Sequence, residues 1–187
     1  MRSQKLFVIL DRDGTILVDH PYLSDPEKIE FFPNAPEALK QLQKAGFGLI
    51  VATNQSGIGR GFFTMESLEK VHKKFRELLV QKGVILDGIY VCPHAPEENC
   101  LCRKPETTLI QKASRELNFE LKESYVIGDK DSDIEMGKKV GAYTILLKTS
   151  PRKNDNEILC EPDSTAGSLL EAVKIILRTA EKCRYNK

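Results

Sequence analysis

One stretch decides the fold: Leu6-Phe7-Val8-Ile9-Leu10-Asp11-Arg12-Asp13-Gly14-Thr15. Its apolar half predicts a short buried strand, and the polar residues that follow mark the end of that strand. Residues two apart along a strand point the same way, so Asp11 and Asp13 can face one site while Arg12 turns aside. Two carboxylates so close repel each other unless a cation or a shared proton compensates, and such oxygens suit Mg²⁺. The alternative interpretation is a strand followed by an ordinary Asp-Gly turn.

The whole chain has the composition of a soluble globular protein. It contains 187 residues, of which 28 are basic and 27 acidic, and 41% are hydrophobic. This length fits one domain over residues 1–187 with a sizeable core. A net charge of +1 does not indicate a nucleic-acid partner, and no apolar run is long enough to span a membrane. Because no signal peptide precedes the first strand, we expect a cytoplasmic protein, and we expect it to act as a monomer.

Strand and helix patterns alternate along the rest of the chain. Apolar runs at 48–52, 89–91, 125–127 and 143–147 predict four further strands. Helical spacing predicts helices between them and a closing helix from Leu169 to Leu177. Residues 53–61 and 150–164 are polar and predict loops. The alternation predicts an α/β fold with right-handed crossovers and a parallel sheet.

The loop from Cys92 to Cys102 has the composition of a metal site. It reads Cys92-Pro93-His94-Ala95-Pro96-Glu97-Glu98-Asn99-Cys100-Leu101-Cys102. Three thiolates and one imidazole match a closed structural zinc site, with Cys92, His94, Cys100 and Cys102 as ligands. The alternative is three buried free cysteines and a surface histidine. We favour Zn²⁺ because the prolines bend the loop and little apolar sequence is available to fold it. Cys160 and Cys183 lack comparable partners and are expected to be inert.

Polar side chains also follow the ends of four predicted strands. The carboxyl ends of parallel strands share one edge of a sheet, so a single crevice can collect these side chains. A carboxylate nucleophile, a hydroxyl, a lysine and further carboxylates are what phosphoryl transfer to an aspartate needs. The residues concerned are Asp11, Asp13, Thr53, Arg103, Lys104, Asp129 and Asp133.

In these residues the sequence resembles the haloacid dehalogenase superfamily of phosphohydrolases. The resemblance implies a Rossmann-like three-layer sandwich with a central parallel sheet. The gaps between its motifs leave no room for a large cap domain, so the site is expected to be open. The matching motifs come in the family's order and at its spacing: Asp11-Arg12-Asp13-Gly14-Thr15, Thr53-Asn54-Gln55, Lys104-Pro105 and Gly128-Asp129-Lys130-Asp131-Ser132-Asp133.

The resemblance implies a role for each catalytic residue. Asp11 attacks phosphorus and becomes an aspartyl-phosphate. Asp13 protonates the leaving oxygen and then deprotonates the hydrolytic water. Thr53 and Lys104 hold the phosphoryl oxygens.

The resemblance also implies a catalytic Mg²⁺. Its ligands are Asp11, the backbone carbonyl of Asp13, and Asp129. Three roles stay open for Asp133, which can orient Lys130, orient the waters of the metal, or start the next helix.

Two subfamilies with a zinc loop and no cap fit the sequence. The heptose bisphosphate phosphatases resemble it in Val18-Asp19-His20-Pro21-Tyr22 and in Thr53 to Gly61, whereas the histidinol-phosphate phosphatases share the short loop from Cys92 to Cys102. We favour the first because its resemblance covers more of the chain. The expected partner is therefore a small phosphorylated sugar, and the expected contacts are Asp19, His20, Tyr22, Asn54, Gln55, Ser56, Arg60, Arg103 and Lys130.

Two of the basic residues have competing interpretations, and a third has one. His20 is either a substrate contact or an ordinary loop residue, and Arg60 binds either a phosphate or a surface carboxylate. His72 lies in a charged stretch of a predicted helix, so we expect it to be solvated.

Overall fold

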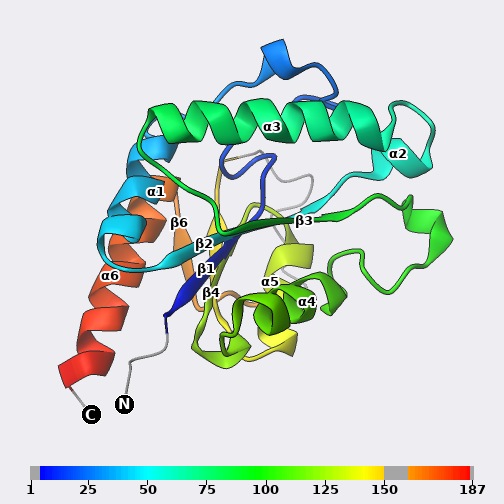
Figure 1. Cartoon of the computed structure of the whole chain (residues 1–187). Helices are drawn as coiled ribbons and strands as arrows, with labels where there is room; N and C mark the ends of the chain where they lie inside the picture. Colours follow the sequence, from blue (N-terminus) through cyan, green and yellow to red (C-terminus); the bar gives the residue numbers. More distant parts are fainter. Residues whose placement is uncertain (1–4, 150–159, 186–187) are drawn as a thin grey trace.

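The structure, a computed structural model, describes residues 5–149 and 160–185, with side chains as far as residue 181. Its described strands form one sheet in the order β3-β2-β1-β4-β5-β6, and every pairing is parallel (Figure 1). The strand order reverses between β1 and β4, which is where a crevice opens at the carboxyl ends of a parallel sheet. The strands are β1 (Phe7–Leu10), β2 (Gly48–Asn54), β3 (Gly88–Cys92), β4 (Tyr125–Gly128), β5 (Tyr143–Leu147) and β6 (Ser164–Ala166).

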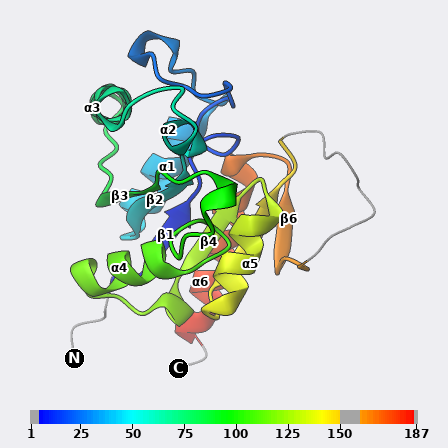
Figure 2. The ribbon, with the colours of Figure 1, turned by 90° about the vertical axis from the view of Figure 1, so that its right-hand side faces the viewer.

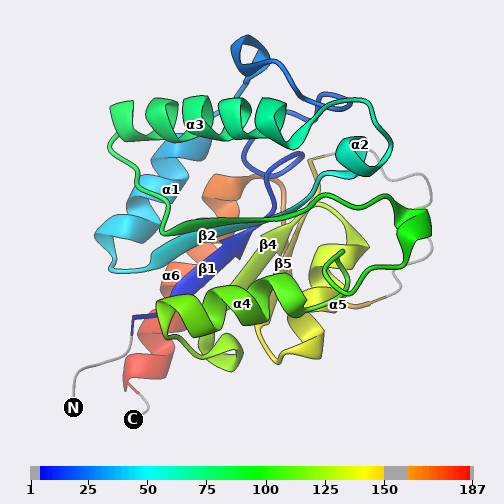
Figure 3. The same ribbon diagram turned by 45° about the vertical axis from the view of Figure 1, so that its right-hand side comes forward.

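Helices cover both faces of this sheet, as the three-layer prediction requires. In β1, Val8 and Leu10 join one apolar cluster, while Phe7 and Ile9 join the other, because side chains alternate along a strand. The first cluster is closed by α1 (Ala35–Lys44), α3 (Met65–Gln81) and α6 (Leu169–Tyr185). The second is closed by α4 (Thr108–Leu117) and α5 (Asp131–Lys139), which lie in front of the sheet in Figure 3.

The predicted helix signals are confirmed at α1 and α3. Pro36 stands in the first turn of α1, and Gly46 adopts a φ of +91° just beyond its end, which a side chain would resist. The Thr64 hydroxyl accepts a hydrogen bond from the backbone N–H of Ser67 at 3.2 Å and so caps α3. Three short 3₁₀ helices complete the described part: η1 (Pro26–Lys28), η2 (Pro96–Glu98) and η3 (Leu121–Glu123). Among the helices of the described ranges, none is both long and apolar enough to cross a membrane.

Two segments predicted as loops contain regular structure. One turn of helix, α2 (Ser56–Gly59), follows β2 inside the predicted loop 53–61. The predicted loop 150–164 ends in β6, which pairs with β5 at the edge of the sheet (Figure 2). The loop prediction was wrong over Ser56–Gly59, and β6 was not predicted, because these elements are three or four residues long, which is too short for a periodic pattern to develop. Residues 150–159 of that loop lie outside the described residues.

Candidate active site and metal site

A buried lysine joins the ends of three strands. Asp11 directly follows β1, and its backbone N–H donates to the carbonyl of Ile127 at 3.0 Å, which ties it to β4. Lys104 Nζ lies 2.8 Å from Asp11 Oδ1 and 2.6 Å from Asp133 Oδ1. It also donates to the carbonyl of Ala52 in β2 at 2.8 Å. Widely separated motifs therefore meet at one point, as the strand-end argument predicted.

The charges in this cluster depend on each other. Burial by itself would lower the pKa of Lys104, but the carboxylates of Asp11 and Asp133 raise it well above its usual value. Burial raises the pKa of Asp133, and the charge of Lys104 opposes that rise. Lys104 therefore remains an ammonium, which is what a group that holds phosphoryl oxygens must be.

Three carboxylates form a group that fits a divalent cation. Asp11, Asp129 and Asp133 each offer a buried oxygen, and these oxygens lie within 4.8 Å of one another. Asp129 Oδ1 is buried and has no hydrogen-bond partner among the described residues. Burial and the charge of Asp11 raise the pKa of Asp129 to about 7. An orphaned carboxylate oxygen beside two others fits Mg²⁺, which binds through few carboxylates and completes its shell with water and phosphate.

Gly14 makes room for this group. Its φ is +84°, and a Cβ at this position would collide with the carboxylate of Asp129. A larger residue is thus disfavoured for two reasons: the left-handed backbone conformation and the lack of space for a Cβ. The glycine of the first motif allows the chain to leave β1 while Asp129 approaches it closely.

Asp133 has two partners in the structure. Besides its ion pair with Lys104, it accepts a hydrogen bond from the backbone N–H of Lys130 at 3.2 Å, at the start of α5. The prediction that it starts the next helix is therefore consistent with the geometry. The ion pair with Lys104 was not among the roles considered from the sequence.

The carboxylate of Asp13 is held from two sides. Arg12 donates from Nε to Oδ1 at 3.0 Å and from Nη2 to Oδ2 at 2.9 Å. Gln55 Nε2 donates to the same Oδ2 at 2.8 Å and also to Thr53 Oγ1 at 2.8 Å. Asp13 is therefore fixed in the plane of a guanidinium fork, next to the second motif.

Arg12 is not simply turned aside, and His72 is half-buried rather than freely solvated. Arg12 is fully buried, and its Nη1 lies 2.8 Å from Nε2 of His72 in α3. The sequence predictions missed this contact. The charged neighbours of His72 describe the exposed face of the helix and say nothing about the side that faces Arg12. The sequence contained one signal, a basic residue between two catalytic aspartates. If an arginine at such a position is buried, its donors need partners.

The polar residues after β2 lie against the catalytic lysine. Asn54 accepts from the backbone N–H of Lys104 at 3.0 Å and donates to the Lys104 carbonyl at 3.2 Å. Ser56 opens α2 on the same side of the sheet. In this structure Asn54 therefore positions the lysine segment, and its amide is already engaged.

The loop after the first motif contacts the residue that precedes α5. Lys130 Nζ lies 3.7 Å from Asp19 Oδ2, so a strand-end residue and the loop are joined by an ion pair. His20 lies 3.4 Å from Glu30, on the surface. Tyr22 has a φ of 54° and is 45% exposed.

Arg60 and Arg103 both contact the cysteine loop. Arg60 Nη2 lies 3.0 Å from Glu97 Oε1, so the structure shows the surface carboxylate of its two predicted partners. Arg103 donates from Nη1 to the carbonyl of His94 at 3.2 Å. The cysteine loop thus touches α2 on one side and the lysine segment on the other.

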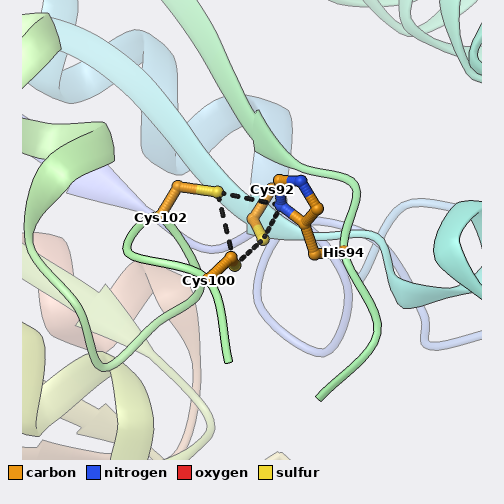
Figure 4. A group of neighbouring side chains, drawn as sticks. All are labelled: Cys92, His94, Cys100 and Cys102. Carbon is orange, nitrogen blue, oxygen red and sulfur yellow. Dashed lines mark hydrogen bonds between the residues drawn. The ribbon is translucent and has the colours of Figure 1, made fainter. Parts of the chain in front are cut away.

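The four predicted metal ligands converge (Figure 4). Cys92 Sγ lies 3.5 Å from Cys100 Sγ, which lies 3.5 Å from Cys102 Sγ. His94 Nδ1 lies 3.2 Å from Cys102 Sγ. Tetrahedral zinc with Zn–S bonds of about 2.3 Å would place its sulfurs about 3.8 Å apart, so the group is nearly the right size. The alternative of a separate surface histidine is excluded.

Of the remaining cysteines, the described side chains include that of Cys160, which does not join this group. Cys160 is a free, half-buried thiol. The side chain of Cys183 lies outside the described residues, so the expectation about it stays a prediction.

Known proteins share both the sequence and the fold of this chain. The sequence profile described as "HAD-hyrolase-like" matches residues 101–172. A D-glycero-beta-D-manno-heptose-1,7-bisphosphate 7-phosphatase of Helicobacter pylori strain J99 is 45% identical over 143 residues, covering 76% of this chain and 82% of that protein. This chain belongs to the haloacid dehalogenase-like hydrolases. The resemblance inferred from the motifs is confirmed.

Other relatives extend the similarity over nearly the full length. A protein of the same name from Haemophilus ducreyi is 36% identical over 179 residues, covering 92% of this chain and 98% of that protein. The crystal structure of D,D-heptose 1.7-bisphosphate phosphatase from B. bronchiseptica, complexed with magnesium and phosphate, superposes with a TM-score of 0.84 at 28% identity, covering 93% of this chain and 99% of the other. The histidine biosynthesis bifunctional protein HisB of Legionella pneumophila is 41% identical over 140 residues, which cover 73% of this chain but 40% of that protein.

Proposed function

We propose that this chain is a Mg²⁺-dependent phosphatase that removes the C7 phosphate of D-glycero-beta-D-manno-heptose 1,7-bisphosphate, in the synthesis of heptose precursors for bacterial lipopolysaccharide. The observation that carries the proposal is the buried cluster in which Lys104 joins Asp11 and Asp133, with Asp13 beside it. The heptose phosphatases that share sequence and fold over nearly the whole chain support the choice of substrate.

The chemistry proceeds in two steps on the protein's own residues. A carboxylate oxygen of Asp11 attacks phosphorus, and the bond from phosphorus to the sugar oxygen breaks. Asp13 donates a proton to that oxygen as it leaves. Asp13 then takes a proton from a water that attacks the aspartyl-phosphate, which releases phosphate and restores Asp11.

The other groups of the cluster stabilise charge. Lys104 and the hydroxyl of Thr53 donate to the phosphoryl oxygens, and both are buried, so their interactions are only weakly screened. Asp11, Asp129 and the backbone carbonyl of Asp13 would hold a Mg²⁺ ion, which would supply further positive charge for the phosphoryl group. Asp133 keeps Lys104 in place through their ion pair.

The cysteine loop has a structural role in this proposal. Cys92, His94, Cys100 and Cys102 would fill all four positions of a Zn²⁺ ion, which would leave none for a catalytic water. The folded loop then holds Arg103 at its exit, through the carbonyl of His94.

Substrate choice depends on groups at the mouth of the site. We propose that loop 19–22, Arg103 and Lys130, which pairs with Asp19, grip the sugar hydroxyls and the remote phosphate. In this proposal, the substrate is also contacted by three residues that follow β2: Gln55, Ser56 and Arg60. An arginine fork can bond two phosphate oxygens, which suits a bisphosphate. We further propose that the chain acts as a cytoplasmic monomer.

A second candidate is histidinol-phosphate phosphatase. The observation that favours it is the relative HisB, which matches this chain at 41% identity, together with the short cysteine loop. The heptose assignment is preferred because the match to the Haemophilus ducreyi protein covers 92% of this chain, whereas the match to HisB covers 73%.

A comparison of kcat/KM tests the proposal. Phosphate release is measured with Mg²⁺ on the heptose bisphosphate, on histidinol phosphate and on p-nitrophenyl phosphate. We expect the heptose bisphosphate to be hydrolysed at C7 with much the highest kcat/KM, and Asp11→Asn, which is nearly isosteric, to abolish all three activities. A clear preference for histidinol phosphate would move the assignment to the second candidate. Substantial turnover by Asp11→Asn, with deamidation excluded, would refute the aspartyl-phosphate.

A further inference from the structure

We propose that His72 is a positioning residue for proton transfer: it fixes Arg12, and Arg12 fixes the carboxylate of Asp13. The inference rests on the proposed phosphatase function. His72 belongs to none of the catalytic motifs and lies on α3, 60 residues away from Arg12 in the sequence.

The hydrogen-bond donor and acceptor between Arg12 and His72 can be assigned without ambiguity. A guanidinium offers only donors, so Nε2 of His72 must accept the hydrogen bond from Arg12 Nη1, and the histidine must be neutral with its proton on Nδ1. Burial, together with the charges of Arg12 and Arg76, lowers the pKa of His72 to about 3, which agrees with this tautomer. The neutral imidazole is therefore an acceptor held ready for one particular arginine.

Each of the three guanidinium nitrogens of Arg12 contacts one of two side chains. Nε and Nη2 form the fork on Asp13, and Nη1 contacts His72. The side chain is fully buried, so the loss of a partner would be costly. Because the fork is planar, the bond to His72 at one end sets the angle at which the other end meets the carboxylate.

The angle of that carboxylate matters for one chemical event in particular. Asp13 has to present a proton to the leaving oxygen within hydrogen-bond reach, and a small displacement costs much of this contribution. Gln55 binds Oδ2 of Asp13 as well, but it does not contact Oδ1. Arg12 alone among the described contacts touches both oxygens, so it determines the plane of the group.

Two classes of substrate separate this role from a general loss of structure. An alkyl phosphate such as a sugar phosphate needs protonation of its leaving oxygen, whereas p-nitrophenolate leaves readily without a proton. The ratio kcat/KM includes only the steps up to the departure of the leaving group. It therefore excludes the later step in which Asp13 acts as a base on water.

The experiment uses the full chain with Mg²⁺ and three variants. In His72→Gln the side-chain oxygen can stand where Nε2 stands now, while in His72→Asn the acceptor is too short to reach Arg12. Lys73→Asn, at an exposed position of the same helix, is the matched control for asparagine in α3. Both His72 variants keep a polar side chain beside the arginine, so they avoid burying an apolar group against a charge.

His72→Asn should lower kcat/KM on the heptose bisphosphate by about 10-fold, a fraction of the full general-acid contribution, and on p-nitrophenyl phosphate by less than about 2-fold. His72→Gln and Lys73→Asn should stay within about 2-fold of the wild type on both substrates. Equal losses on both substrates, no loss, or a Gln variant as impaired as the Asn variant would overturn the inference.

This outcome is separable from the proposed function. If the wild type hydrolyses histidinol phosphate instead, the heptose assignment fails, but the comparison with p-nitrophenyl phosphate proceeds unchanged, because histidinol phosphate is also an alkyl phosphate. A wild type inactive on all three substrates would refute the phosphatase itself, and the role of His72 with it.

Discussion

Replacement of Lys104 by methionine should expose how strongly the catalytic carboxylates depend on one buried charge. The lysine side chain is 3% exposed, and its ammonium lies 2.8 Å from Asp11 and 2.6 Å from Asp133, whose side chains are 5% and 1% exposed. Methionine keeps most of the length and removes the charge. Lys104→Met would then leave two neighbouring carboxylates buried without their cation.

The expected cost follows from this geometry. Removal of one partner of a buried ion pair typically costs about 3–5 kcal/mol of unfolding free energy. The cost should shrink at lower pH, since burial already raises the pKa of Asp133 and the loss of Lys104 would raise it further. When the folded pKa of a carboxyl is above its unfolded value, the folded state takes up the proton first, so stability recovers as the pH falls. The variant should therefore approach the wild type between pH 8 and pH 5.5.

Urea unfolding without added Mg²⁺ measures this at the two pH values. The control is Lys139→Met, because that lysine is 39% exposed and pairs with Glu106 and Glu135 at 3.2 and 3.1 Å on the surface. Exposed pairs contribute about 0–1 kcal/mol, so the control should change little at either pH. If Lys104→Met costs no more than the control at pH 8, or costs the same at both pH values, the carboxylates do not depend on the lysine in the way the structure implies.

Four further predictions concern the metal sites and the substrate. Gly14→Ala should weaken Mg²⁺ binding in calorimetry by at least about 10-fold, because a Cβ would displace Asp129, and unchanged binding would contradict the close approach. Since the pKa of Asp129 is raised to about 7 and Mg²⁺ needs the carboxylate, Mg²⁺ affinity should fall by up to about 10-fold per pH unit below pH 7; an affinity constant from pH 8 to pH 5.5 would argue against this ligand. Purified protein should hold about one Zn²⁺ per chain, and Cys102→Ser should lower that content, as read by metal analysis. Arg103→Ala should reduce kcat/KM for the heptose bisphosphate at least about 10-fold more than for p-nitrophenyl phosphate, and equal losses would remove its part in recognising the remote phosphate.

The sequence was informative wherever apolar runs end in polar residues. Such a run needs no partner to be recognised, and it places the next side chain at the carboxyl end of a strand. This is why Asp11, Thr53 and Asp129 were predicted at one edge of the sheet. The cysteine loop was equally clear, because three thiols and an imidazole within eleven residues can converge without help from the rest of the chain.

Other predictions failed where length or context removed the signal. The strand β6 has three residues and the helix α2 has four, so neither contains a full period. The charged neighbours of His72 concealed that its ring contacts a buried arginine.

The sequence by itself determined the class of fold, the order of the motifs and the kind of chemistry, because these depend on residue types and on spacing along one segment. Only the tertiary structure decided which polar groups share partners. Lys104 lies between Asp11 and Asp133 because three strand ends converge, and His72 reaches Arg12 because α3 packs over the turn after β1. Partners of this kind are set by packing between elements far apart in the sequence. No local sequence pattern shows which of these elements will come together.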